Sequence, residues 1–239
     1  MEPTVIFVTV LLFACVLQAL LRHVGPYVPL DEATPVGRRA CQEGSREAAK
    51  LRELRWAYRH RGLLVSPPLA YAALSFLYET EVDWLVWPLG GTFVVLGVAL
   101  RVWAQAHIRF RLRGHRHLAT TGPYAIVRNP LYIANVLTCV GATIVSELLW
   151  LVPITVLWCM AVYSLVVRQE EARLLRKYGK AYHEYLSAVP RWVPRALSLT
   201  GLGRASGEHL RAAFLVEARG LLVLVPYVIK EAASTWLGR

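Results

Sequence analysis

The stretch that decides the fold is LYIANVLTCVGATIVSELLWLVPITVLWCMAVYSLVV, residues 131–167. It consists of two apolar blocks, 131–147 and 149–167, and only a short polar turn at Ser146 and Glu147 separates them. Each block is close to the ~20 residues that an α-helix needs to cross about 30 Å of hydrocarbon. Because the connection is so short, the two helices should pack side by side and antiparallel. The stretch therefore predicts a membrane helical hairpin.

Three further apolar blocks of similar length lie upstream, at residues 3–21, 62–78 and 84–108. The second of these blocks contains Pro67 and Pro68. Membrane helices tolerate proline when neighbouring groups bond the carbonyls that it leaves without a donor. The five blocks together predict an all-α integral membrane protein with about five transmembrane helices.

Basic side chains fall on one side of this layout. The segments after the first, third and fifth blocks are rich in Arg and Lys, whereas the charged residues of the opposite segments are Glu79, Glu81, Asp83 and Glu147. Cytoplasmic loops carry the excess of Lys and Arg. We therefore expect the amino terminus outside and the carboxyl terminus in the cytoplasm. These loops also explain the net charge of +11, so we expect no nucleic-acid partner.

The blocks also suggest how the chain is organised. We expect a transmembrane domain at residues 1–195, which includes a basic cytoplasmic insert at 22–61. We expect the tail, 196–239, to be helical and to lie at the interface or against the bundle. No C-x-x-C pair occurs, and three of the four cysteines lie inside apolar blocks; the cysteines are Cys15, Cys41, Cys139 and Cys159. This pattern indicates neither a disulfide framework nor a metal site.

One cluster of polar residues lies in the predicted cytoplasmic loop between the third and fourth blocks and reads HRHLATTGPYAIVRNPLY, residues 115–132. Gly122 and Pro123 predict a tight turn. Asn129 and Pro130 predict the start of a helix, because Asn caps free N–H groups and Pro fits the first helical position. Helix N-termini attract carboxylates and phosphates, so this loop is a candidate binding site for an anionic group.

A second cluster follows the fifth block and reads RQEEARLLRKYGKAYHEYLSAVPRWVP, residues 168–194. If the fifth helix continues, Glu170 lies one turn beyond Val166, where a carboxylate is costly unless it has a partner. The hairpin should place this cluster beside the first one. We expect its tyrosines to form an interfacial aromatic belt; they are Tyr178, Tyr182 and Tyr185.

The two clusters together resemble a known family. The pattern T-x-G-P-Y-x-x-V-R-N-P-x-Y, followed about forty residues later by E-E-x-x-L-x-x-x-Y-G-x-x-Y-x-x-Y-x-x-x-V-P-R-x-x-P, is similar to the isoprenylcysteine carboxyl methyltransferases. That family belongs to a wider membrane group with the phospholipid N-methyltransferases. The resemblance covers residues 115–194 and is weak elsewhere.

The resemblance implies an S-adenosyl-L-methionine site at the cytoplasmic membrane surface, with a lipid acceptor that enters from the bilayer. It implies that Arg128 and Glu170 are the candidate catalytic residues. It implies the following cofactor-binding residues: His117, Leu118, Ala119, Tyr124, Asn129, Pro130, Tyr132 and Glu170. These types suit the cofactor, because Glu accepts from an ammonium or a hydroxyl, a helix start holds a carboxylate, and a tyrosine ring faces a cationic sulfur.

The chain departs from the family pattern at several places. Arg116, flanked by two histidines, stands at the family's histidine position, and Asn129 stands where His is commoner. The Arg that serves the substrate carboxylate in prenylcysteine enzymes is replaced by Val166. The nearest Arg is Arg168, about 200° further around the helix, and we take it as the candidate substrate-binding residue. This replacement argues against a prenylcysteine carboxylate as acceptor, but not against methyl transfer.

The sequence therefore predicts an S-adenosylmethionine-dependent membrane methyltransferase that acts on a lipid or lipidated substrate. A phospholipid amine and a small thiol remain open as acceptors. Weaker alternatives are an NADPH-dependent membrane reductase and a non-catalytic membrane scaffold. Glu170 and Glu171 are also compatible with ion pairs to Arg173 and Arg168 on a wet helix surface.

Overall fold

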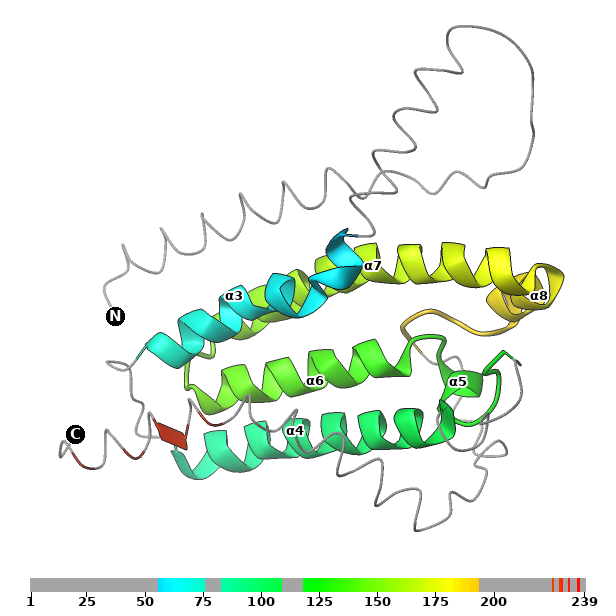
Figure 1. Ribbon diagram of the computed structural model, residues 1–239. Coiled ribbons are helices and arrows are strands. Elements are labelled where there is room, and N and C mark those ends of the chain that lie inside the picture. The colour runs from blue at the N-terminus through cyan, green and yellow to red at the C-terminus, as the bar shows by residue number, and fades with distance from the viewer. Residues whose placement is uncertain are drawn as a thin grey trace, which may run out of the picture. The chain divides into compact units, whose positions relative to one another are not determined.

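The computed structural model describes residues 56–75, 83–108 and 118–193, together with the single positions 225, 228, 229, 232 and 236. The described part contains helices and no strand (Figure 1). In chain order the helices are α3 (Arg61–Leu74), α4 (Asp83–Ala106), α5 (Pro123–Ile126), α6 (Pro130–Val145), α7 (Leu151–Tyr178) and α8 (Lys180–Ala188). The all-α fold class is therefore confirmed for these residues.

The helix boundaries follow the apolar blocks closely. Among the described residues, two helices are long and apolar enough to cross a membrane, Trp84–Ala106 with 23 residues and Leu151–Tyr178 with 28, while the apolar helix α6 is shorter. The fifth block, expected at 149–167, continues as α7 for a further eleven residues, to Tyr178. The block at 3–21, nearly all of the insert and most of the tail lie outside the described residues. The five spans and their orientation stay predictions.

The chain forms two compact units. The first comprises Met1–Pro67 and Leu157–Arg173, and the second comprises Pro68–Val156 and Leu174–Arg239.

The proline pair lies inside α3, where one unit ends at Pro67 and the other begins at Pro68, and the helix continues through it. Pro67 and Pro68 have no N–H, so the carbonyls of Leu63 and Leu64, four residues earlier, lack their helical donors. The Ser66 hydroxyl donates to the Leu63 carbonyl at 2.8 Å, and the Trp158 indole Nε1 of α7 donates to the Leu64 carbonyl at 2.7 Å. Both freed carbonyls are thus bonded, which is the condition under which a membrane helix tolerates prolines.

In the second unit, α4 and α6 lie side by side (Figure 1). At Gly90, Gly97 and Gly141 the two backbones approach so closely that an added β-carbon would clash. A β-carbon on Gly97 would lie 2.8 Å from the Ala134 carbonyl oxygen, and one on Gly141 would lie 2.6 Å from the Gly90 carbonyl oxygen. Small residues at the interface permit such an approach, which gives membrane helices most of their packing energy. Arg101 of α4 also donates to the side-chain oxygen of Asn135 in α6.

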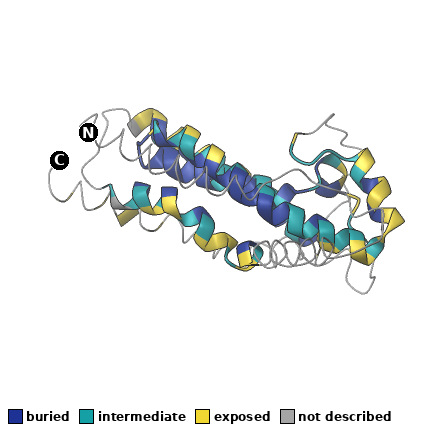
Figure 2. Ribbon diagram, turned by 90° about the horizontal axis from the view of Figure 1, so that it is seen from above, coloured by how far each residue is buried: buried dark blue, intermediate teal, exposed yellow. Residues whose placement is uncertain are grey.

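The start of α7 packs against this pair. Thr143 and Thr155 are fully buried and their hydroxyl oxygens lie 3.2 Å apart, which joins α6 to α7. An apolar core around Val86, Val140 and Ile144 includes Val152 and Val156 of α7. Most of α6 is buried, as Figure 2 shows. The helical hairpin predicted from residues 131–167 is therefore confirmed at its turn, where Glu147 has φ of 66° and is itself buried.

The proline carbonyls give a first testable prediction. Trp158→Phe keeps an aromatic ring at this position but removes the indole N–H that donates to the Leu64 carbonyl. The substitution should lower the free energy of unfolding by about 1–2 kcal/mol. Thermal unfolding in detergent measures this loss. Pro68→Ala restores a backbone N–H for Leu64, so Trp158→Phe should cost less in that background.

Trp150→Phe is the matched control, because the buried Nε1 of Trp150 has no hydrogen-bond partner among the described residues. It should leave the unfolding temperature nearly unchanged. Equal losses for the two Trp variants would contradict the assignment of the Trp158 bond.

The α4–α6 interface gives a second prediction. Gly141→Val places branched carbons against Gly90 and Val94, so it should destabilise the protein by at least about 2 kcal/mol. Gly91→Ala is the control on the same helix pair, because a β-carbon there has nothing within 4 Å and alanine favours the helix. Chemical or thermal unfolding of both variants checks the difference. A Gly141→Val protein with an unchanged free energy of unfolding would show that the two backbones do not touch.

Candidate active site

The loop that leads into α6 begins with the tight turn that the sequence predicted. Gly122 has φ of 62° and ψ of −134°, which glycine adopts most readily because it has no β-carbon. Pro123 then starts the short helix α5, which the bonds from Ala125 N–H to the Gly122 carbonyl and from Val127 N–H to the Pro123 carbonyl close at 3.1 and 3.2 Å. This turn delivers Tyr124 into the interior, where it is 8% exposed.

The end of α4 holds this turn through His107. The imidazole is 7% exposed, and its Nε2 lies 2.9 Å from the Thr121 hydroxyl oxygen. The ring lies so close to the turn that a β-carbon added to Gly122 would be 2.7 Å from the His107 Nδ1. The sequence analysis did not single out His107, because it is the last but one residue of an apolar block and belongs to no motif.

The start of α6 corrects one expectation. The helix begins at Pro130, as predicted, but the Asn129 side chain makes no capping hydrogen bond. Its backbone, with φ of −126° and ψ of 56°, lies outside the extended region in which a capping side chain normally reaches the next amides. The Asn129 carbonyl instead accepts from the N–H groups of Tyr132 and Ile133, at 3.1 and 3.2 Å.

Asn129 therefore keeps a free polar group at a buried place. The residue is 8% exposed, and its amide Nδ2 is buried without a hydrogen-bond partner among the described residues. A buried donor without a partner costs about 1–3 kcal/mol, and such groups commonly serve a ligand or an ordered water. Pro130 and Tyr132 beside it are also buried.

The second sequence cluster meets the first inside the second unit. The Tyr185 hydroxyl of α8 donates to the Tyr124 carbonyl at 2.6 Å. The Arg128 backbone N–H donates to the Pro190 carbonyl at 2.9 Å. Residues from Gly122 to Tyr132 and from Tyr182 to Pro190 therefore lie side by side, as the hairpin predicted.

The tyrosines of α8 differ from the sequence expectation. Tyr182 and Tyr185 are 2% and 7% exposed, and their rings pack 5.9 Å apart. They form part of the interior and not an interfacial belt, because α8 turns back at Gly179 with φ of 52° and packs against the α5 loop. Tyr178 is half-buried.

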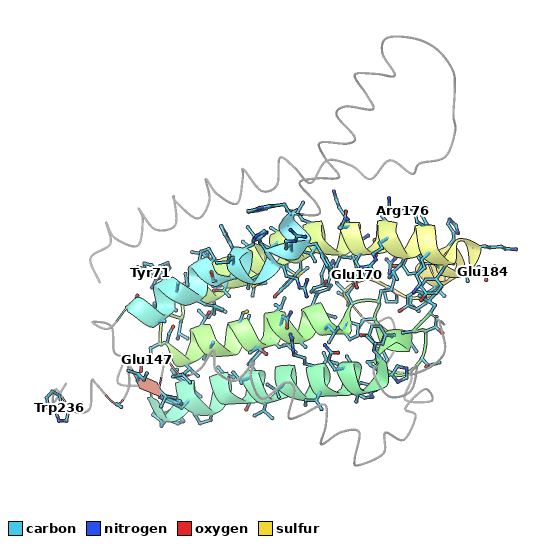
Figure 3. The ribbon with its side chains drawn as sticks, in the orientation of Figure 1. Tyr71, Glu147, Glu170, Arg176, Glu184 and Trp236 are labelled. Carbon is cyan, nitrogen blue, oxygen red and sulfur yellow. The ribbon has the colours of Figure 1, made fainter. Side chains whose placement is uncertain are left out.

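The remaining predicted residues lie on α7 and at the start of the loop. Glu170 and Arg168 are half-buried, and Glu171 is 8% exposed. The three belong to the first unit, and Figure 3 shows Glu170 and Arg176 along α7, with Glu184 on α8. Leu118 and Ala119 are half-buried members of the second unit. His117 lies outside the described residues.

The arrangement in the second unit offers aromatic rings and hydrogen-bond donors in a buried setting. Tyr124, Tyr132 and Asn129 are buried. Arg128, which directly precedes Asn129 in the sequence, is half-buried. No group of three or more His, Cys, Asp or Glu side chains in the described part could hold a metal ion. Side chains of these types are able to bind a charged organic group, because aromatic rings attract a cation and hydrogen-bond donors attract an anion.

Comparison with known proteins places this chain in a family. The model of the phospholipid methyltransferase family matches residues 89–181, which span α4 to the start of α8. No solved structure matches the chain.

Three curated proteins are similar to it. The nickel-cobalt-cadmium resistance protein NccN of Alcaligenes xylosoxydans xylosoxydans is 33% identical over 62% of this chain and 69% of its own length. The cobalt-zinc-cadmium resistance protein CzcN of Cupriavidus metallidurans is 33% identical over 52% of this chain and 58% of its own. Protein-S-isoprenylcysteine O-methyltransferase B of Arabidopsis thaliana is 28% identical over 55% of this chain and 71% of its own length.

The family match and the isoprenylcysteine enzyme agree with the two motifs on which the resemblance rested. The chain therefore belongs to the membrane methyltransferase group that contains the phospholipid methyltransferases and the isoprenylcysteine carboxyl methyltransferases.

Proposed function

We propose that this protein is an integral membrane methyltransferase that uses S-adenosyl-L-methionine and acts on a lipid or lipidated acceptor. The observation that carries the proposal is the junction, within the second unit, of the loop before α6 with α8 and the residue pair that follows it. There the Tyr185 hydroxyl bonds the Tyr124 carbonyl and Arg128 N–H bonds the Pro190 carbonyl. Family membership supplies the reaction type, and the apolar helices α4 and α7 support the membrane location.

The residues of the loop fit the proposed cofactor. The buried amide Nδ2 of Asn129, which has no partner among the described residues, would donate to its carboxylate at the start of α6, where the helix dipole also favours negative charge. The rings of Tyr124 and Tyr132 would face its cationic sulfur. Leu118, Ala119 and Pro130 would pack against its apolar parts, and His117 would bind beside them.

Glu170 completes the proposed cofactor-binding set on the strength of the family resemblance. Its carboxylate would accept hydrogen bonds from the ammonium or from a ribose hydroxyl. A half-buried carboxylate of this kind contributes most when it binds a charged donor. Arg128 and Glu170 are the residues that we propose for catalysis, with Arg128 near the reacting groups as a fixed positive charge.

The chemistry makes modest demands on the protein. The bound cofactor supplies an electrophilic methyl group on sulfur, which the acceptor attacks in line. The buried rings and donors of the loop would orient the two partners and exclude water. A dedicated general base is not needed when the acceptor is already an anion or a free amine.

The acceptor site is less defined. Val166, which stands where prenylcysteine enzymes carry an Arg, is fully buried. Because valine is apolar, this position offers no charge to a substrate carboxylate. Arg168, two residues further along α7, remains the proposed substrate-binding residue. A phospholipid amine and a small thiol stay open as acceptors, and methyl labelling of a whole lipid extract followed by mass spectrometry would separate them.

Asn129 provides the sharpest test of the cofactor site. Asn129→Leu removes a buried donor without a partner, so stability should stay the same or rise. The same variant should raise the dissociation constant of S-adenosylhomocysteine about tenfold, because the ligand loses a hydrogen bond to a charged group. Calorimetric titration in lipid nanodiscs measures the affinity, and thermal unfolding measures the stability.

Failure of the unchanged protein to bind S-adenosylhomocysteine would contradict the proposed function. Unchanged affinity together with lower stability in Asn129→Leu would assign the residue a structural role.

Glu170 gives a separate prediction. Glu170→Gln keeps the shape but removes the charge, so the dissociation constant of S-adenosylhomocysteine should rise about 10- to 100-fold. Glu184→Gln is the matched control, because that side chain is 68% exposed and pairs with Lys180 on α8. Equal affinities for the two variants would remove Glu170 from the site and would favour a surface ion pair.

A further inference from the structure

The end of α4 carries a buried imidazole that the proposed reaction leaves without a role. His107 follows directly after Ala106, and the helix widens there into a π-type turn at His107 and Ile108. Such widened turns recur at functional sites, because they redirect one side chain out of the regular helical register. The next residue that the structure describes is Leu118, at the start of the loop that leads to Tyr124 and Asn129.

His107 contacts this loop through both edges of its ring. Nε2 lies 2.9 Å from the Thr121 hydroxyl oxygen, and the Nδ1 edge lies against Gly122, where an added β-carbon would be 2.7 Å from Nδ1 and 2.8 Å from Cε1. The ring centroid is 6.2 Å from that of Tyr124. One side chain thus fixes three successive features of the loop: the Thr121 hydroxyl, the Gly122 turn and the ring of Tyr124.

The opposite side of the same loop is fixed by α8. Tyr185 donates to the Tyr124 carbonyl at 2.6 Å. Tyr124 is therefore held from the α4 side by His107 and from the α8 side by Tyr185. The next element along the chain is the start of α6, with the buried amide of Asn129.

We propose that His107 is a positioning residue for the cofactor loop: it locks the turn at Thr121 and Gly122 so that Tyr124 and Asn129 meet the bound cofactor. This inference rests on the proposed function. A leucine would fill the space equally well, but only a directional group bonds the partly exposed Thr121. Burial of an imidazole is costly without a hydrogen bond, and the contact with the Thr121 hydroxyl supplies one.

The role predicts a characteristic set of kinetic changes. His107→Phe keeps a planar ring but loses the bond to Thr121, so the loop samples other positions before the cofactor binds. The dissociation constant of S-adenosylhomocysteine and the KM for S-adenosylmethionine should both rise about tenfold. The value of kcat at saturating cofactor should change by less than about threefold, because the bound loop reaches the same position.

Matched variants separate the bond from the ring. His107→Gln places an amide near the position of Nε2 and should restore affinity to within about threefold of the unchanged protein, whereas His107→Asn is too short to reach Thr121 and should behave like His107→Phe. Thr121→Val should reproduce the His107→Phe effect from the exposed loop, and Thr121→Ser should not. The double variant His107→Phe with Thr121→Val should be no weaker than either single variant, because both remove the same bond.

The experiment is calorimetric titration of the full chain in lipid nanodiscs with S-adenosylhomocysteine for each variant, with steady-state methyl transfer to a membrane lipid extract as the second readout. Weak binding by His107→Phe and Thr121→Val, with rescue by His107→Gln, supports the proposal. Full affinity in Thr121→Val overturns it, even if His107→Phe fails to fold. Loss of affinity that follows a loss of thermal stability in every variant, including His107→Gln, also overturns it and makes His107 a structural residue. Absence of binding by the unchanged protein overturns the proposed function and this inference together, whereas the other two outcomes leave the proposed function intact.

Discussion

The close approach of α4 and α6 is the constraint on which the second unit depends. Gly97 lies against Ala134, and Gly141 lies against Gly90, so the two backbones are in contact along antiparallel helices. This contact brings the end of α4 near the start of α6, because antiparallel neighbours pair end with beginning. Within the described residues, His107 at the end of α4 therefore contacts the turn at Thr121 and Gly122, which precedes Asn129 at the start of α6. Larger residues at the glycine positions would separate the helices and release the loop.

The site follows from a second contact, between elements far apart in the chain. The Tyr185 hydroxyl bonds the Tyr124 carbonyl, and the backbone of Arg128 bonds that of Pro190. The first motif and the part of the second motif that follows Arg173 are thereby joined within the second unit, where Tyr182 and Tyr185 are buried. Family membership explains why these two stretches occur together. The structure adds which atoms join them, and it shows that the amide of Asn129 is a buried donor without a partner among the described residues.

Helix positions could be predicted from the sequence because their signals are local. The apolar blocks located α4, α6 and α7, Gly122 and Pro123 located the turn, and the proline pair predicted that its carbonyls would need other donors. The features that could not be predicted depend on tertiary contacts. The glycines of α4 meet α6 only through packing, the partner of His107 lies fourteen residues away in the chain, and Asn129 fails to cap because of its backbone angles. The sequence of α8 is compatible with tyrosines at a membrane interface and with tyrosines in a core. The burial of Tyr182 and Tyr185 therefore depends on how α8 packs.

The central claim is that the loop before α6 and the segment after α7 form one binding site for S-adenosylmethionine. Amide hydrogen exchange of the protein in nanodiscs, with and without S-adenosylhomocysteine, tests it most directly. The account predicts that the ligand slows exchange jointly in residues 118–132 and 182–190, while the exchange of α3 stays unchanged. Protection confined to only one of the two segments, or to neither, would contradict it.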